Sequence, residues 1–363
     1  MKIVGLILCS VVVCLLASCS SQRTPTAVAT LTPSPETEST STIAPTVVSN
    51  VSLVAGQWNY LFYHPELKKV VLVNGGPDRG KSKNDPLELW AWDGTQWTLI
   101  SADPQGQGPV WRNFAGAAFD SKRNRLVIYG GVQDRNSRME DTWEWDGQTW
   151  TQFKVPGPGF REGAAMAYDE ARGRTILYGG ANEKFEILGD TWAWDGAQWT
   201  QVSTSGPPPR FPSAILYDPA REKVLLFSGH FVGLNDFINF SDFWEWDGMA
   251  WHEIIVEGEK PGARNIAQMA FDPLNKRVLL FGGGQEAFLS DMWSWDGTSW
   301  SQISESGAPA RSGLGGAYDP GRNRLVAFGG VEEPGGTAIT DTWEWDGQYW
   351  ICIQGCNNMR KRR

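Results

Sequence analysis

The stretch Asp341-Thr342-Trp343-Glu344-Trp345-Asp346-Gly347-Gln348-Tyr349-Trp350 is the last of six copies of one phrase, Trp-x-Trp-Asp-Gly-x-x-Trp. The other copies span residues 90–97, 143–150, 192–199, 244–251 and 293–300, and the six together use 18 of the 20 tryptophans. Their central tryptophans stand at positions 92, 145, 194, 246, 295 and 345, a period of 49 to 53 residues. A fixed period of this size is typical of repeat proteins, so the remaining sequence is expected to repeat with it.

Each copy of the phrase predicts a tight β-hairpin with a tryptophan-rich face. Side chains alternate across a sheet, so the first two tryptophans of a copy lie on the same face of one strand. Asp-Gly favours a two-residue turn, because glycine adopts positive φ without steric cost. The third tryptophan then lies on the returning strand, within reach of the other two. A buried tryptophan removes about 150–250 Å² from water, or about 4–6 kcal/mol gross. Because tryptophan stands at the same three positions of every copy, we expect these side chains to pack in the core rather than to bind a ligand.

A second block recurs between the tryptophan phrases. In one copy, Ala164–Asp169 is followed by Arg172-Gly173-Arg174 and then by Thr175–Gly180. The last part ends in Gly-Gly at 75–76, 130–131, 179–180, 282–283 and 329–330, with Ser228-Gly229 in the fourth repeat. Apolar runs bounded by turn residues predict strand, turn, strand. Each repeat therefore has four strands: a first strand rich in small residues, a second that ends in Gly-Gly, a third with Trp-x-Trp, and a fourth after the Asp-Gly turn.

Six repeats of four short antiparallel strands predict an all-β protein, a six-bladed β-propeller of four-stranded antiparallel blades over residues 53–356. The strand ending in Gly-Gly, followed at fixed spacing by the tryptophans, resembles the kelch repeat, and the Trp-Asp-Gly hairpin resembles a bacterial form of it. Every repeat reads in the same strand order, so no strand exchange is visible where the ring closes. A closing strand from Asn50–Val54 stays open as an alternative.

The N-terminal residues predict export and a lipid anchor. The apolar run Ile3–Ala17 is too short for a membrane-spanning helix and fits a secretory signal. Leu16-Ala17-Ser18-Cys19 resembles the lipobox of bacterial lipoproteins, which implies a signal peptide at 1–18 and lipidation of Cys19. Alternatives are a plain signal peptide or a short anchor. Residues 19–52 are rich in Thr, Ser and Pro and are expected to form an unfolded tether. The propeller is thus expected outside the cytoplasm, on the surface or periplasmic side of a bacterial membrane.

The charge balance restricts the class of partner. The chain has 32 Lys and Arg against 41 Asp and Glu, a formal net charge of −9. Loss of the signal removes only Lys2, which leaves 31 − 41 = −10. An acidic chain disfavours nucleic acid and electrostatic membrane docking, so we expect the protein to touch the membrane through its lipid alone. The expected partner is a protein or a glycan, and the chain is expected to be a monomer. The basic residues at 357–363 are expected to form a solvated tail.

The cysteines and histidines predict a disulfide and no metal site. After the anchor only Cys352 and Cys356 remain, and such a pair in an exported protein is expected to be oxidised. The three histidines, His64, His230 and His252, fall on different parts of the predicted blade and do not form a ligand set. No metal and no cofactor is expected.

Antiparallel blades place the variable loops at 77–87, 132–140, 181–189, 230–241, 284–290 and 331–340 on one face, which we call the loop face. The first turns and the Asp-Gly turns lie on the other, the turn face. Variable loops on a rigid frame are where recognition usually resides, and the kelch resemblance implies that the loop face holds the ligand. Each of five blades also carries an arginine eight residues before the aspartate that ends its first strand; these candidate ligand-binding residues are Arg112, Arg161, Arg210, Arg264 and Arg311.

Two interpretations of the arginines stay open. They can form a cationic mouth for carboxylates, because guanidinium presents a rigid fork. They can instead pair with Asp141, Asp190, Asp242, Asp291 and Asp341, which open the third strands on the same face. We favour pairing, because arginine and aspartate recur together; in the first repeat Gly56 and Glu88 take the two places.

No catalytic motif appears, which favours a membrane-tethered binding module over an enzyme. One alternative is an acidic-sugar enzyme resembling the kelch-type sialic-acid mutarotases, with arginines at the mouth and a carboxylate base. The bases would come from Glu140, Glu183, Glu186 or Glu286, which nothing in the sequence distinguishes. Another alternative is a structural envelope protein. No catalytic residue is assigned.

Overall fold

The computed structural model describes residues 53, 58–75, 82–101, 103, 106–134, 136–211, 213–233, 237–284, 287–304, 310–333 and 336–356. All of them belong to the compact unit Pro45–Arg363; the other unit is Met1–Ala44. The predicted signal peptide, Cys19, the tether and the basic tail lie outside the described residues. Within the described residues, no helix is long and apolar enough to cross a membrane.

The described residues form strands and no helix, and six four-stranded sheets follow one another along the chain. Blade 1 holds β1 (Asn59–His64), β2 (Lys69–Asn74), β3 (Glu88–Trp92) and β4 (Trp97–Ser101). Blade 2 holds β5 (Gly116–Asp120), β6 (Arg125–Tyr129), β9 (Thr142–Trp145) and β10 (Trp150–Phe153). Blade 3 holds β11 (Ala165–Asp169), β12 (Arg174–Tyr178), β13 (Thr191–Trp194) and β14 (Trp199–Ser203).

The other three blades repeat this order. Blade 4 holds β15 (Ala214–Asp218), β16 (Lys223–Phe227), β19 (Phe243–Trp246) and β20 (Trp251–Glu253). Blade 5 holds β21 (Gln268–Asp272), β22 (Arg277–Phe281), β23 (Met292–Trp295) and β24 (Trp300–Ser304). Blade 6 holds β25 (Ser312–Asp319), β26 (Arg324–Val331), β27 (Thr342–Trp345) and β28 (Trp350–Gln354).

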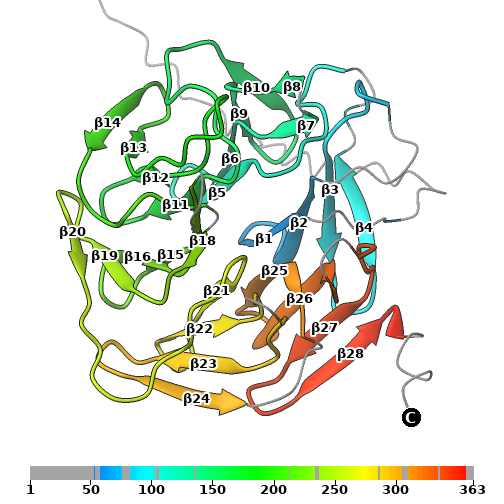
Figure 1. Cartoon of the computed structure of the whole chain (residues 1–363). Helices are drawn as coiled ribbons and strands as arrows, with labels where there is room; N and C mark the ends of the chain where they lie inside the picture. Colours follow the sequence, from blue (N-terminus) through cyan, green and yellow to red (C-terminus); the bar gives the residue numbers. More distant parts are fainter. Residues whose placement is uncertain are drawn as a thin grey trace, which may run out of the picture. The chain divides into compact units, whose positions relative to one another are not determined.

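The six sheets close into a ring, which confirms the predicted six-bladed propeller. Every sheet is antiparallel and pairs its strands in chain order. The first strands pack against one another around the centre, and β25 of blade 6 returns to β1 of blade 1 (Figure 1). Each described sheet takes its strands from one repeat, so none is exchanged at the closure. Of the alternative closing strand Asn50–Val54, only Leu53 is described, and it packs against the apolar cluster between blades 1 and 6.

Small residues allow the first strands to approach one another at the axis. A Cβ on Gly116 of β5 would lie 2.4 Å from Met166 Sδ in blade 3, and one on Gly316 of β25 would lie 2.3 Å from the Phe281 ring in blade 5. Such distances are far below van der Waals contact, so side chains at these positions would push the blades apart. The small-residue pattern of the first strand is therefore a packing requirement.

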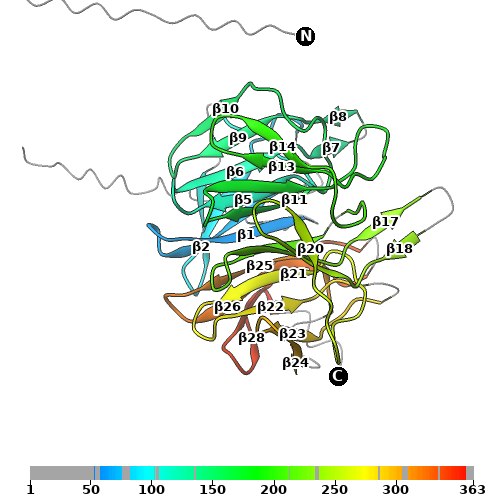
Figure 2. The same cartoon turned by 90° about the vertical axis from the view of Figure 1, so that its left-hand side faces the viewer.

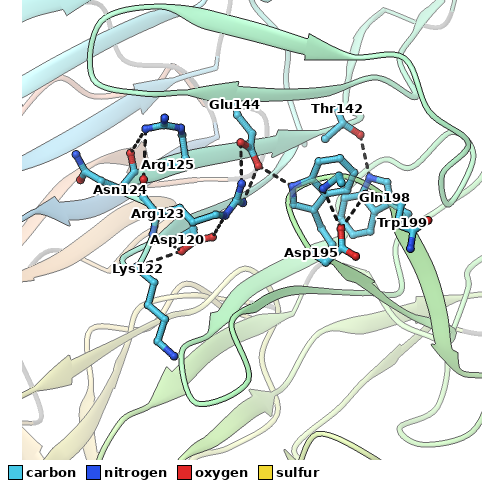
Figure 3. Close-up of polar contacts among 12 residues, drawn as sticks. Asp120, Lys122, Arg123, Asn124, Arg125, Thr142, Glu144, Asp195, Gln198 and Trp199 are labelled. Carbon is cyan, nitrogen blue, oxygen red and sulfur yellow. Dashed lines mark hydrogen bonds and ion pairs between the residues drawn. The ribbon is translucent and has the colours of Figure 1, made fainter. Parts of the chain in front are cut away.

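Indole N–H groups tie blade 3 to blade 2. Trp194 donates from Nε1 to Glu144 Oε1 at 2.7 Å, and Trp199 donates to Thr142 Oγ1 at 2.9 Å. Figure 3 shows Glu144 between Trp199 and Arg123, and Arg123 donates to both oxygens of the Glu144 carboxylate at 2.7 and 3.0 Å. A buried carboxylate with three charge-assisted or polar donors is well satisfied, so the contact stabilises the interface between blades.

The same contacts close the ring. Trp92 of blade 1 donates to Glu344 Oε1 of blade 6 at 2.7 Å, and Trp97 donates to Thr342 Oγ1 at 2.8 Å. Both indoles lie in an apolar cluster that spans the two blades. Side chains rather than a shared strand therefore hold the first and last blades together.

At some of the interfaces between blades, the indole N–H has no hydrogen-bond partner among the described residues. The sequence of the preceding blade explains at which ones. The Nε1 atoms of Trp145 and Trp246 have no hydrogen-bond partner among the described residues. The preceding blades carry Ala91 and Ala193 where blades 2 and 6 carry glutamate. Trp300 Nε1 also has no partner in the described part of the chain, where Phe243 replaces the threonine of the preceding blade.

Two loops contain hairpins that the sequence analysis did not predict. β7 (Val132–Asp134) pairs with β8 (Ser137–Arg138) in blade 2, and β17 (His230–Val232) pairs with β18 (Phe237–Asn239) in blade 4. Both hairpins project from the loop face (Figure 2). At the chain end, the predicted Cys352–Cys356 disulfide is present and joins β28 to the residue that follows Gly355.

We expect Trp194→Phe to destabilise the protein more than Trp246→Phe. Both indoles are 1% exposed, so the two changes remove similar packing. Only Trp194 donates a hydrogen bond, to a carboxylate, which is worth about 1.5–3 kcal/mol. Chemical unfolding of the two variants should therefore show a difference of about that size. Equal losses of unfolding free energy would contradict a stabilising role for the bond to Glu144.

Candidate functional site at the axial rim

The five candidate arginines lie inside their blades. Their exposed fractions are 1–4%, and each guanidinium contacts both oxygens of the aspartate that opens the third strand of its blade. Arg161 donates to Asp190 at 2.6 and 2.7 Å, and Arg264 donates to Asp291 at 2.8 Å through both nitrogens. The arrangement is the bidentate fork that guanidinium and carboxylate favour.

The other N–H groups of these arginines are largely engaged as well. In Arg161, Nη1 also donates to the carbonyl of Gly179 and Nε to that of Pro158. In the other four blades, Nη1 donates to the carbonyls of Gly130, Ser228, Gly282 and Gly329. Each arginine thus fastens the end of the second strand and the start of the third. A direct ligand-binding role for the arginines stays a prediction, and their forks are directed at their own blades.

The pairing lowers the pKa of three of these aspartates, Asp141, Asp190 and Asp291. Burial alone would raise the pKa of Asp190, but Arg161 and the indole N–H of Trp192 outweigh it, so the pKa lies below its usual value. Asp141 and Asp291 behave alike, with Arg112 and Arg264 as the opposing charges. In blade 1, Glu88 instead accepts from Trp90 at 3.1 Å and from Asn74 at 3.4 Å.

The residue after each arginine forms what we call the axial rim. Its members are Asn113, Glu162, Phe211, Asn265 and Ser312. In each blade this residue pairs antiparallel with the residue that follows the Gly-Gly segment, or Ser228-Gly229 in blade 4, and it lies just before or at the start of the strand at the axis. The chain thus places a variable side chain at the same position of five blades, next to an arginine that never changes.

Aromatic rings form a continuous row beside the rim. We define the aromatic row as Trp58, Phe114, Phe211, His230 and Phe237. Successive ring centroids lie 5.0, 6.2, 5.3 and 5.2 Å apart. The row leads from the segment before β1, past the segments before β5 and β15, to the β17–β18 hairpin. Phe237 is 61% exposed, so the outer end of the row faces solvent.

Two buried polar atoms, one on a rim residue and one on a residue of the row, have no hydrogen-bond partner among the described residues. Asn113 Oδ1 and His230 Nδ1 are buried atoms without a hydrogen bond. Burial lowers the pKa of His230 to about 4, so its ring is neutral near pH 7. Glu162 is half-buried, and burial raises its pKa although Arg138 acts in the opposite direction. A buried polar atom without a hydrogen-bond partner is costly in a folded protein.

The remaining sequence candidates are dispersed. His64 ends β1, where the other blades have aspartate, and is buried; His252 lies on β20 and contacts Asp247 at 3.0 Å. Glu140, Glu183 and Glu186 are exposed, and Glu286 is outside the described residues. Among the described residues, no three His, Cys, Asp or Glu side chains are grouped so as to hold a metal ion.

The comparisons with known proteins agree with this architecture. Residues 61–229 match the family model of the KLHDC2/KLHL20/DRC7 Kelch-repeats domain, and no curated protein matches the sequence. The solved structure titled "Structure of YjhT" superposes with a TM-score of 0.61 at 14% identity, covering 83% of this chain and 98% of that one. Family match and six-bladed ring together support a kelch β-propeller; the structural likeness, at this identity, shows the fold alone.

We expect Arg161→Met to cost about 3–5 kcal/mol of unfolding free energy, because it leaves Asp190 half-buried without its counter-charge. The double variant Arg161→Met/Asp190→Leu should recover much of this loss, since it removes the uncompensated charge as well. Chemical unfolding of the wild type and both variants measures the two effects. A single variant as stable as the wild type would show that the pair does not hold the blade.

The aspartates also predict acid sensitivity. The folded pKa values of Asp141, Asp190 and Asp291 are lowered, so the stabilisation that these three carboxylates supply is present above the unfolded carboxyl pKa of about 3.9 and is lost as pH falls through the folded values. Unfolding free energy measured between pH 6 and pH 2 should decline below about pH 5. The decline should be shallower in Arg161→Met/Asp190→Leu; identical slopes would contradict the assignment.

Proposed function

We propose that the protein is a lipid-anchored, extracytoplasmic binding module whose loop face, centred on the axial rim, holds a protein or glycan ligand. The main support is a contrast between two neighbouring residues at the loop-face end of five blades. The arginine is the same in five blades and is buried in its own pair, while the next residue is Asn, Glu, Phe, Asn or Ser. A residue with the same structural task in each blade recurs, as the arginine does, whereas a recognition surface draws on residues that differ from blade to blade.

The two faces of the propeller support this interpretation. The turn face is nearly constant in sequence, and the polar groups of its Asp-Gly turns are hydrogen-bonded within the turn. For example, Asp195 accepts hydrogen bonds from the backbone N–H groups of Ala197 and Gln198 at 2.9 Å. The loop face carries the β7–β8 and β17–β18 hairpins, the axial rim and the aromatic row. Variable loops on a rigid frame are the usual place for recognition.

The paired arginines favour binding over the acidic-sugar enzyme. That alternative needs guanidinium groups free to hold a carboxylate and a carboxylate base beside them. The five forks contact their blade aspartates instead, and the three described glutamates considered as bases are exposed. No observation on the described residues adds support to the enzyme.

Export and anchoring rest on the sequence. Leu16-Ala17-Ser18-Cys19 supplies a lipidation signal, and the Thr-, Ser- and Pro-rich segment at 19–52 supplies a spacer between membrane and propeller. The disulfide between Cys352 and Cys356 is compatible with an oxidising compartment.

Binding of the full-length chain to a glycan and peptide array should depend on the rim. We expect Glu162→Gln combined with Phe211→Ala to reduce the signal at least tenfold, because both side chains are at the rim. Glu170→Gln on the turn face, where Glu170 is exposed, is the matched control and should leave binding unchanged. Binding that survives the rim changes, or no binding to any glycan or peptide, would refute the proposal.

For the anchor, we expect Cys19→Ala to release the protein from the membrane fraction, because the propeller has no other predicted attachment. Fractionation followed by metabolic labelling with a fatty-acid analogue measures both location and lipid. Cys14→Ala is the control and should remain labelled and membrane-bound. Retention of Cys19→Ala in the membrane would exclude lipid as the anchor.

A further inference from the structure

We propose that the outer edge of blade 6 is the contact surface of a homodimer, in which β28 of one copy pairs antiparallel with β28 of a second copy. The inference is independent of the proposed function at the axial rim, and it differs from the monomer expected from the sequence. Three features support it: an open strand edge, an apolar stripe along that edge, and a register in which the stripe faces itself.

β28 is the outermost strand of its blade. Within the described residues it pairs with β27 alone, and it lies at the circumference of the ring (Figure 1). The Asp346 N–H donates to the carbonyl of Tyr349 at 3.1 Å, so these residues form a hydrogen-bonded pair of the ladder. Such pairs alternate along antiparallel strands, so the N–H and C=O groups of Trp350 and Cys352 point away from β27. A strand edge of this kind is a template for a further strand.

An apolar stripe lies along this edge. Tyr349, Ile351 and Ile353 are 62%, 44% and 37% exposed. Alternate residues of a strand lie on the same face, so these three side chains are in line. At the position of Ile351, directly after the last tryptophan of the phrase, the other five blades carry a polar residue: Thr98, Thr151, Thr200, His252 and Ser301. Exposed isoleucine on an open edge favours the addition of a strand, which polar residues disfavour.

Ile353 is more exposed than its counterparts in the other blades. The residue three positions after the last tryptophan of the phrase is half-buried in the other five blades: Ile100, Phe153, Val202, Ile254 and Ile303. Each of these packs against an apolar cluster shared with the next blade. Ile353 stands at the same position and is exposed. Adjacent exposed apolar side chains mark an interaction site, and a partner that covers Ile353 also covers Ile351.

The stripe is complementary to itself. When Ile351 of one copy lies opposite Ile351 of the other, Tyr349 of each copy lies opposite Ile353 of the other. All six side chains then meet apolar side chains on one face of a continuous sheet. In the same register the outward N–H and C=O groups of Trp350 face those of Cys352, so backbone hydrogen bonds form across the junction. One patch is thus used twice, as in the two-fold contacts of most homodimers.

The charges at the chain end favour the antiparallel arrangement. Trp350–Gln354 carries no charge, so two copies of β28 approach each other without repulsion. Four basic residues, 360–363, follow β28 in the sequence. A parallel pair would bring both basic segments to the same end, where they would repel each other. An antiparallel pair separates them and brings each toward Asp346 of the other copy. Because β28 lies at the circumference, this contact leaves the axial rim of both copies uncovered.

Cysteine cross-linking in membranes that contain the full-length chain tests the register. Opposite residues of a non-hydrogen-bonded pair have Cα atoms about 4.5 Å apart, within reach of a disulfide. We expect Ile351→Cys to give at least tenfold more cross-linked dimer on a non-reducing gel than Ile353→Cys, whose counterpart lies about 13 Å away. Ile353→Cys is equally close to the native disulfide, so it controls for thiol exchange. Thr200→Cys, at the Ile351 position of blade 3, should not cross-link.

Sedimentation equilibrium of the detergent-solubilised full-length chain measures the association. We expect Ile351→Thr/Ile353→Thr to raise the Kd of the dimer at least tenfold, because it replaces the stripe with polar side chains. Both residues are exposed, so the change should not disturb folding. Leu274→Thr is the matched control, since Leu274 is 67% exposed on the turn between β21 and β22, and it should change the Kd less than twofold.

A wild type that is monomeric in both experiments would overturn the inference. So would a dimer that Ile351→Thr/Ile353→Thr does not weaken, or cross-linking at Thr200→Cys equal to that at Ile351→Cys. A monomeric wild type whose binding to the array is lost in Ile351→Thr/Ile353→Thr would show that the edge takes a different partner, and would overturn it as well. Glu162→Gln/Phe211→Ala should leave the dimer intact, so failure of this inference and failure of the proposed function are distinguishable.

Discussion

The fold depends on the burial of one indole from each repeat against the blade before it. The central tryptophans of the six phrases are 0–3% exposed, and they occupy the wedges between neighbouring sheets. Where the preceding blade offers glutamate or threonine, the indole N–H groups are also hydrogen-bonded, as between blades 2 and 3 and between blades 6 and 1. Because the closing interface uses the same contacts as another interface, the ring does not need a shared strand.

A second set of contacts, made by the buried arginines, fixes the loop-face end of the blades. The buried arginine of each blade, except the first, joins the end of the second strand to the start of the third through the blade aspartate and a backbone carbonyl. The loops are thereby fixed at their bases, and the residue beside the arginine is free to differ. Five blades therefore have a recurring arginine in a fixed position and a variable residue beside it, and these variable residues make up the axial rim.

The sequence predicted the parts of the molecule that repeat. The tryptophan period determined the number of blades, Gly-Gly and Asp-Gly located the turns, and the joint recurrence of arginine and aspartate favoured the pairs that the structure contains. It did not predict the β7–β8 and β17–β18 hairpins, because stretches such as Val132–Asp134 occur in single repeats and are too short for a periodic signal. The axial rim was not predicted from the sequence for the same reason, because its residues do not recur. A search for what recurs selects Arg161, whereas Glu162, the neighbouring rim residue proposed to bind, differs from its counterparts.

The central claim is that repeated residues build the ring and that the variable residues beside them meet the ligand. Hydrogen–deuterium exchange of the full-length chain, with and without a ligand identified by the array, tests this most directly. The account predicts slower exchange in the segments around Asn113, Glu162, Phe211 and the β17–β18 hairpin, with the Asp-Gly turns unchanged. Protection confined to the Asp-Gly turns, with the axial rim unaffected, would contradict it.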